Sequence, residues 1–261
     1  MKQSRNNADV DLMEWSKETV EFYLSEVERL GEYNATSFYN QSDLSRVKDC
    51  DIMIIGINPG VGCTYSEWKL KNDISQDFLY YGNPCFRGMS NHEIIYEMSE
   101  KYDPYKRRKG WDIWVKIYKM LCYSSKGEIL KQLDRFVITN MIFFGTAKEI
   151  DIFKGIDRFR CAEQTLKLIE ILKPKVVLLL GKECRKLFKS VTKCTQMESI
   201  SSDNTVFYCY YNDCHVISIY HTAYYRYYSK SVNIEKIGKI IGSILDNTFN
   251  GKHDIERTSL Y

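Results

Sequence analysis

The chain contains four short runs of apolar residues that are rich in Val, Ile and Leu. Each run is continuous rather than alternating and has the length of one strand; the runs cover residues 51–57, 136–139, 175–180 and 215–220. A strand that is apolar on both faces must be covered on both faces, which is typical of a parallel sheet between two layers of helices. The pattern therefore predicts a buried, mostly parallel central sheet.

Segments with apolar residues at helical spacing separate these runs. We expect helices over residues 10–30, 111–123, 157–172, 182–190 and 232–245, and one further strand over residues 205–211. Strands that alternate with helices favour the α/β class, here a three-layer α/β/α sandwich with a short, mostly parallel central sheet of about four strands.

The length of 261 residues suits a single domain with an insertion. We assign residues 1–250 to that domain and expect a mobile tail over residues 251–261. Residues 61–109 show no clean period, carry many aromatic side chains and end in a basic cluster. A loop of this length inside a compact domain is usually functional, so we predict a functional role for this insertion.

The composition limits the class of protein. With 44% hydrophobic and 27% charged residues, the chain can bury a core. No apolar stretch approaches the roughly 18 residues of a membrane span, and the first residues lack the apolar run of a secretory signal. We therefore expect a soluble, cytoplasmic monomer with no membrane partner. The net charge of +3 is too small to indicate a polyanionic partner by itself.

The nine cysteines and the 20 tyrosines are the unusual counts. No two cysteines form a C-x-x-C pair, and their odd number argues against a complete disulfide framework, so we expect reduced thiols and predict neither a metal nor a cofactor. The tyrosines admit two interpretations, an AT-rich coding sequence or side chains that stack on a ligand.

The first apolar run leads into Gly-Ile-Asn-Pro-Gly, residues 56–60. Ligands of parallel α/β sheets bind at the carboxyl ends of the strands, where this turn would lie. Glycines allow close approach of a ligand, and Pro59 stiffens the turn, so Asn58 would present a rigidly held amide. The spacing matches neither a Walker loop nor a G-x-G-x-x-G dinucleotide fingerprint.

Polar residues also follow the other three runs. Asn140 offers both a donor and an acceptor, which suits the edge of a base. Gly181 and Lys182 begin a helix whose amides could hold a phosphate. His221 could donate to a developing oxyanion, and the tyrosines and cations of residues 222–230 suit stacking and phosphate contacts. Because parallel strands share one carboxyl edge, we expect these groups to converge there.

In order and spacing these segments resemble the uracil-DNA glycosylase superfamily. Residues 56–60 are similar to the first catalytic motif of its mismatch-specific and single-strand-selective branches, and Asn140 ends a segment similar to the one that reads the base. Residues 173–181 resemble the segment before the phosphate-binding turn, and His221 stands where the second catalytic motif begins. The resemblance spans about residues 50–230.

The resemblance implies a role for each matching position. Asn58 would orient the attacking water, and His221 would stabilise negative charge on O2 of the departing pyrimidine. The base would be bound by Ile57, Asn140, Phe86 and Tyr80, with an aromatic ring of the insertion stacking on it. DNA would be contacted by Gly60, Gly181, Lys182, Thr222, Tyr224, Tyr225, Arg226 and Lys230. The implied partner is DNA, single-stranded or double-stranded with an extruded base, and no metal or cofactor is implied.

The chain departs from the family pattern in two places. The second motif, usually His-Pro-Ser, is His-Thr-Ala-Tyr-Tyr here, and the insertion is longer than the usual loop. At Gly60 the chain lacks the bulky ring with which strict uracil enzymes block 5-substituents. We therefore hypothesise a glycosylase for uracil or a 5-substituted pyrimidine, directed at modified phage DNA in host defence.

Two other classes stay open on the sequence alone. One is a non-catalytic nucleic-acid-binding protein that retains the fold, and the other is an unrelated α/β hydrolase of nucleotides or nucleosides. A serine-nucleophile mechanism is disfavoured, because the chain has no G-x-S-x-G elbow.

Overall fold

A computed structural model describes much of the chain. The described residues are 2–38, 40, 42, 44, 47–59, 63–71, 112–123, 128–129, 132, 134–145, 155–194, 196–222 and 231–249. Most of the predicted insertion and the predicted tail lie outside these ranges.

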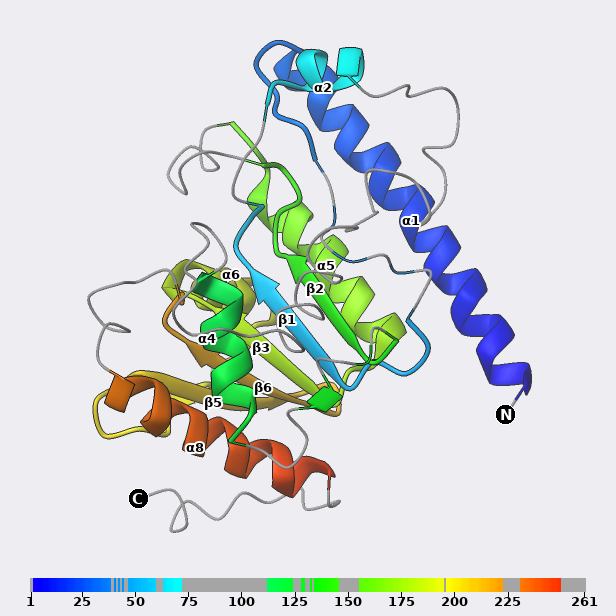
Figure 1. Cartoon of the computed structure of the whole chain (residues 1–261). Helices are drawn as coiled ribbons and strands as arrows, with labels where there is room; N and C mark the ends of the chain where they lie inside the picture. The colour runs from blue at the N-terminus through cyan, green and yellow to red at the C-terminus, as the bar shows by residue number, and fades with distance from the viewer. Residues whose placement is uncertain are drawn as a thin grey trace.

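The described part of the chain contains alternating helices and strands (Figure 1). The strands are β1 (Ile52–Gly56), β2 (Phe136–Asn140), β3 (Val176–Leu180), β4 (Glu198–Ser199), β5 (Val206–Tyr211) and β6 (Cys214–Ile219). The helices are α1 (Lys2–Leu30), α2 (Tyr65–Lys71), α4 (Asp112–Leu121), α5 (Arg158–Leu172), α6 (Lys182–Thr192) and α8 (Ser231–Phe249). All of the predicted elements are confirmed, with ends that differ by a few residues and an α1 that begins earlier than expected.

Within the described residues the strands form one six-stranded sheet of order β2-β1-β3-β6-β5-β4. The first four strands in this order run parallel, whereas β5 is antiparallel to β6 and β4 is antiparallel to β5. The α/β class is confirmed, but the prediction of about four strands was too low. The expected strand at residues 205–211 joins the sheet as β5, and β4 has only two residues, too few to leave a periodic pattern.

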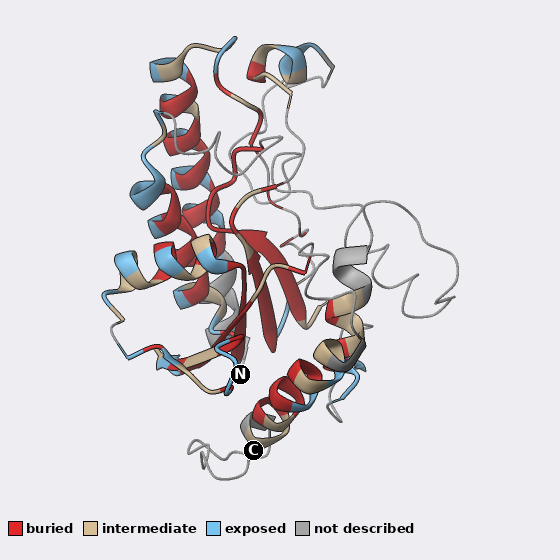
Figure 2. Cartoon of the chain, turned by 90° about the vertical axis from the view of Figure 1, so that its left-hand side faces the viewer, coloured by how far each residue is buried: buried red, intermediate tan, exposed pale blue. Residues whose placement is uncertain are grey.

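Two layers of helices cover the sheet (Figure 2). Along β1, Met53 and Ile55 belong to the core shared with α1, α5 and α6, whereas Ile52 and Ile54 belong to the core shared with α4 and α8. This alternation explains why the strands are apolar at every position, since successive side chains point to opposite faces. The result is the predicted three-layer α/β/α sandwich.

Local sequence sets the ends of α5, which leads into the central strand β3. The carboxylate of Asp157 accepts hydrogen bonds from the backbone N–H groups of Phe159 and Arg160, so it caps the start of the helix. Lys173 adopts a left-handed conformation with φ 45°, and Pro174 prevents the helix from continuing.

The start of the predicted insertion is not irregular. Residues 65–71 form the short helix α2, and Thr64 pairs with Thr36 in an isolated β-bridge. The side-chain hydroxyl of Thr64 accepts a hydrogen bond from the Glu67 N–H, and the Glu67 carboxylate accepts one from the Thr64 N–H, which is a reciprocal cap. Residues 64–71 are therefore regular, although we expect an irregular insertion over residues 61–109 from the lack of a clean period.

Candidate active site at the carboxyl edge of the sheet

The carboxyl ends of β2, β1, β3 and β6 follow one another along a single edge of the sheet, which we call the carboxyl edge. Asn140 ends β2 and lies directly opposite Gly56, the last residue of β1. Gly181 follows β3, and its N–H donates to the carbonyl of Ile219 at the end of β6. The described residues at the predicted site positions are thus brought to one edge by the parallel order of the strands.

Asn140 packs against the backbone of its neighbour in the sheet. A Cβ atom added to Gly56 would lie 2.7 Å from Asn140 Oδ1, so only glycine leaves room for this amide. Gly56 and Asn140 share the strand parity of Ile54 and Ile138, which lie in the core under α4 and α8. The amide therefore sits over the end of β1 on the α4 side of the sheet.

The amide of Asn140 is buried but incompletely hydrogen-bonded. The residue is 2% exposed, and its Nδ2 has no hydrogen-bond partner in the described part of the chain. Its backbone carbonyl, in contrast, accepts a hydrogen bond of 2.8 Å from Thr165 Oγ1 of α5. A buried N–H₂ group without an acceptor is costly, and such a group suits a ligand that supplies a carbonyl oxygen.

Asn58 lies two residues beyond β1 and is partly buried. Its Nδ2 donates to the carbonyl of Pro59 at 2.9 Å, which fixes the rotation of the amide. The oxygen of an amide is an acceptor that can orient a water but cannot remove its proton at neutral pH.

His221 packs on the turn after β3. A Cβ atom added to Gly181 would lie 3.3 Å from His221 Cβ. Burial and the positive charge of Lys116 lower the pKa of His221 from its ordinary value, since both disfavour the imidazolium. The neutral ring carries one N–H and can donate one hydrogen bond to an anion without being a proton source.

The helix α6 begins at the same edge. Gly181 is its N-cap with φ 99°, a conformation that favours glycine, and no side chain caps the first turn. Cys184 Sγ contacts the carbonyl of Ile55 at 3.4 Å, which fixes this end of α6 on β1. Lys182 is exposed beside it. Uncapped N–H groups and a lysine at a helix start suit an anion.

Two other predicted site residues are buried. Thr222 is fully buried, so its side chain offers no surface to DNA, and Ile57 belongs to the core on the α1 side. The remaining predicted positions lie outside the described residues; they are Gly60, Tyr80, Phe86, Tyr224, Tyr225, Arg226 and Lys230.

The sequence analysis missed three residues that shape this edge. Lys116 of α4 donates to the carbonyl of Thr222 at 3.0 Å, and Thr165 holds the carbonyl of Asn140. Arg185 of α6 stacks on Phe207 with its Cζ 3.5 Å from the ring centroid. A lysine, a threonine or an arginine inside a helix carries no local sequence signal, because each owes its role to a partner far along the chain.

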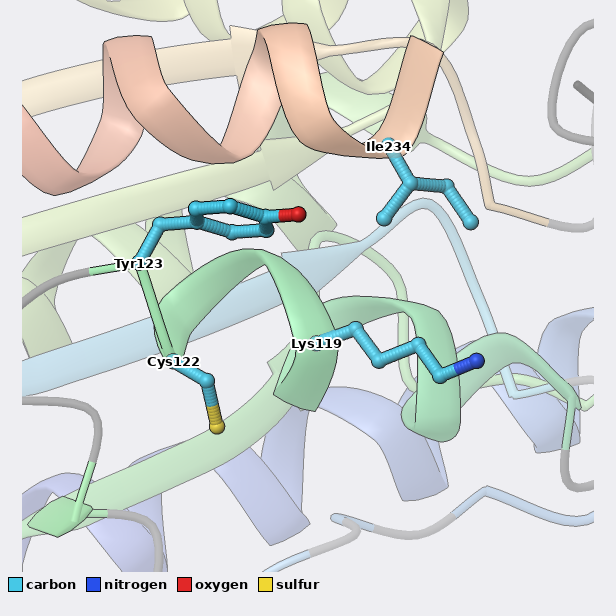
Figure 3. Close-up of a pocket in the computed structure, with 4 residues that line it drawn as sticks. All are labelled: Lys119, Cys122, Tyr123 and Ile234. Carbon is cyan, nitrogen blue, oxygen red and sulfur yellow. The ribbon is translucent and has the colours of Figure 1, made fainter. Parts of the chain in front are cut away.

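A pocket of about 430 Å³ lies between α4 and α8 (Figure 3). Its lining includes Lys119, Cys122, Tyr123 and Ile234, with the Tyr123 ring and the Ile234 side chain directed into the space between the two helices. None of these residues was predicted as part of the site.

No two of the described cysteines form a disulfide bond. Burial raises the pKa of Cys161 to about 12 and that of Cys214 to about 11, so these thiols stay protonated at neutral pH. Among the described residues no group of three or more His, Cys, Asp or Glu side chains is placed to hold a metal ion. Nor does any helix within the described ranges have the length and apolar character needed to cross a membrane.

No protein-family model matches the sequence, and none of the curated proteins matches it.

Proposed function

We propose that this protein is a monofunctional DNA glycosylase of the uracil-DNA glycosylase superfamily. It would hydrolyse the N-glycosidic bond of a flipped-out uracil or 5-substituted pyrimidine and leave an abasic site. The observation that carries the proposal is the buried, unpartnered Nδ2 of Asn140, at the same strand edge as His221. A pyrimidine carbonyl would supply the acceptor that this amide lacks.

The chemistry assigned to the edge needs little proton transfer. In glycosidic hydrolysis the C1′–N1 bond breaks through an oxocarbenium-like state, the base leaves as an anion, and water adds to C1′ and releases a proton to solvent. The neutral imidazole of His221 would donate to O2 of the departing base, where charge develops. Asn58, with its amide fixed by Pro59, would position the water.

The proposed substrate class includes large 5-substituents. The basis is the sequence, in which Gly60 stands where strict uracil enzymes carry a bulky ring, together with a long insertion that would shape the pocket. Modified phage DNA would supply such bases, and the biological role would then be host defence. Taking the base out of the stack costs a few kcal/mol, which contacts in the pocket must offset.

A panel of oligonucleotides tests the proposal. The panel carries uracil, thymine mismatches or 5-modified cytosines, in single and double strands, and alkaline cleavage reveals abasic sites. We expect release of at least one base, lowered by roughly 10²- to 10³-fold in Asn58→Ala and His221→Gln. Asn34→Ala, which removes an exposed amide at the end of α1, is the matched control and should leave release unchanged. Release of uracil alone would contradict the enlarged substrate class.

The alternative is a non-catalytic nucleic-acid-binding protein with the same fold. It predicts binding that weakens steeply with salt, as for any protein that neutralises phosphates, but no abasic product on any member of the panel. Unchanged base release in both Asn58→Ala and His221→Gln would refute the assigned mechanism even if the protein proved to be an enzyme.

A further inference from the structure

The segment that follows β6 is tied to a helix from a different part of the chain. Lys116, near the middle of α4, donates from Nζ to the carbonyl of Thr222 at 3.0 Å. Thr222 is fully buried and directly follows His221. The lysine therefore holds the backbone one residue beyond the imidazole, on the side of the sheet covered by α4 and α8.

We propose that Lys116 is a positioning residue for His221, which fixes the imidazole at the carboxyl edge through the Thr222 carbonyl and places a positive charge beside it. This inference rests on the proposed function and assigns a role within the same site. The lysine does not touch the substrate in this assignment; it acts through the histidine and its backbone.

The positive charge of Lys116 has two effects, and both favour the proposed chemistry. It disfavours a second positive charge on the imidazole, which contributes to the lowered pKa of His221. It also favours a negative charge at the far end of a hydrogen bond from that imidazole, as on O2 of a departing base. The Lys116 cation thus acts together with burial to keep the histidine neutral, and it also stabilises the anion to which the histidine donates.

The start of α6 also lies beside His221. On the α6 side the ring packs on Gly181, which has no side chain. Arg185, one turn further along α6, has a pKa that burial lowers from its ordinary value, and Tyr220 acts on it in the opposite direction. Among the described residues, the charge that acts on the imidazole is that of Lys116.

The test is an NMR titration of the histidine rings in the full chain. The chain has four histidines, and His221→Gln identifies the signal of His221. We expect Lys116→Met to move the titration midpoint of His221 to higher pH, and Lys116→Arg to leave it near that of the wild type. Lys119→Met, one turn along α4 at the α4–α8 pocket, is the matched control and should change nothing.

A second variant separates the charge from the tether. Lys116→Gln removes the charge but keeps an N–H donor for the Thr222 carbonyl, and it should also raise the midpoint of His221. It serves in place of Lys116→Met if that variant does not fold. A midpoint that stays in place in both folded variants, or in Lys116→Gln alone, overturns the proposal.

Base release gives a readout that a merely structural role would not move. The neutral ring is the active form, so release by the wild type should persist below the ordinary pKa of histidine, about 6.5. Lys116→Met should shift the acid limb of the pH–rate profile upward and lower the rate at neutral pH by roughly 10- to 100-fold. Absence of any base release refutes the proposed function, whereas the titration still decides the role of Lys116.

Discussion

At the amino ends of the parallel strands buried charge is matched, whereas at their carboxyl ends buried polar groups lack partners. Asp51, directly before β1, is 2% exposed and pairs with Arg135 before β2 and with Lys175 before β3, the latter at 2.9 Å. One carboxylate therefore ties together the starts of three strands. This end of the sheet, which we call the amino edge, is built to be stable.

Half of the buried side-chain atoms that lack a hydrogen-bond partner in the described residues lie at the other end; the rest are Ser16 Oγ, Thr36 Oγ1, Asn40 Oδ1 and Arg185 Nη1. Four buried side-chain atoms without a hydrogen-bond partner lie in the carboxyl halves of β2 and β6 or just after them; they are Thr139 Oγ1, Asn140 Nδ2, Ser218 Oγ and Thr222 Oγ1. The described strand starts contain none. Since each such group costs stability, their concentration at the carboxyl edge is what a site completed by its ligand requires.

The same contrast between the two edges holds for His215, in β6, and His221, two residues after β6. His215, at the amino edge, is 2% exposed, and its Nδ1 lies 2.8 Å from Tyr208 Oη. His221, at the carboxyl edge, has a pKa that burial and the neighbouring Lys116 cation both lower. The first ring completes a structural hydrogen bond, and the second is held in the form that can donate to an incoming anion.

The largest expected effect is that of Asn140→Leu. Leucine has a similar shape and removes a buried amide nitrogen that has no partner, so stability should rise by about 1 kcal/mol. Base release should fall roughly 10³-fold, about 4 kcal/mol of transition-state stabilisation, because the base edge loses its partner. Denaturant unfolding and the oligonucleotide assay measure the two effects.

Thr165→Val is the control for this substitution. This substitution also replaces a buried polar group by an apolar one, but the Thr165 hydroxyl has a partner, the carbonyl of Asn140. Its loss should therefore cost about 1 kcal/mol of stability. If Asn140→Leu destabilised the protein as much as Thr165→Val, the amide would be a structural group, and the contrast between the two edges would fail.

At the amino edge, Asp51→Ala should lower the free energy of unfolding by about 2–3 kcal/mol, because charge-assisted bonds to two strand starts are lost. Base release per folded molecule should not change. Lys167→Ala, which breaks an exposed ion pair with Glu18, is the control and should cost under about 1 kcal/mol. A fall in base release at full folding would show that the two edges are coupled.

Gly56→Ala should lower base release by less than Asn140→Leu does, but by more than Asp51→Ala does. The added methyl would meet Asn140 Oδ1 at 2.7 Å and force the amide aside, so base release should fall about 10-fold. Gly238→Ala makes a similar clash with the Tyr123 ring, between α8 and the end of α4. Because that ring is 45% exposed and can move, base release should be unchanged there. Equal losses in both variants would mean that the effect is general strain.

The fold was largely predictable because its information is local. Strands such as β3 are apolar at every position, and Pro174 marks the boundary between α5 and β3. What was missed had weak local signals: β4 has two residues, and α2 lies in a segment whose short helix gives fewer than two full periods. The parallel order then carried Asn140 and the Gly181 turn to one edge.

The site was predictable only as a set of backbone positions. The sequence does not tell which buried side chains find a hydrogen-bond partner, because those partners lie far along the chain. Lys116 meets the Thr222 carbonyl, and Thr165 meets the carbonyl of Asn140, through packing of α4 and α5 on the sheet. Thr222 was expected at the surface, and its complete burial follows from the same packing.

The smallest expected effect is that of Tyr208→Phe, which tests whether His215 at the amino edge has a purely structural role. Tyr208→Phe removes the hydroxyl that pairs with His215 Nδ1 and should cost about 1 kcal/mol of stability. Tyr210→Phe is its control: this ring also contacts His215, edge to face, but Tyr210 is 44% exposed, and loss of its hydroxyl should cost almost nothing. Neither variant should alter base release. A loss of release in Tyr208→Phe alone would mean that β6 transmits the state of His215 to His221, six residues further along, so that the amino edge would also tune the chemistry.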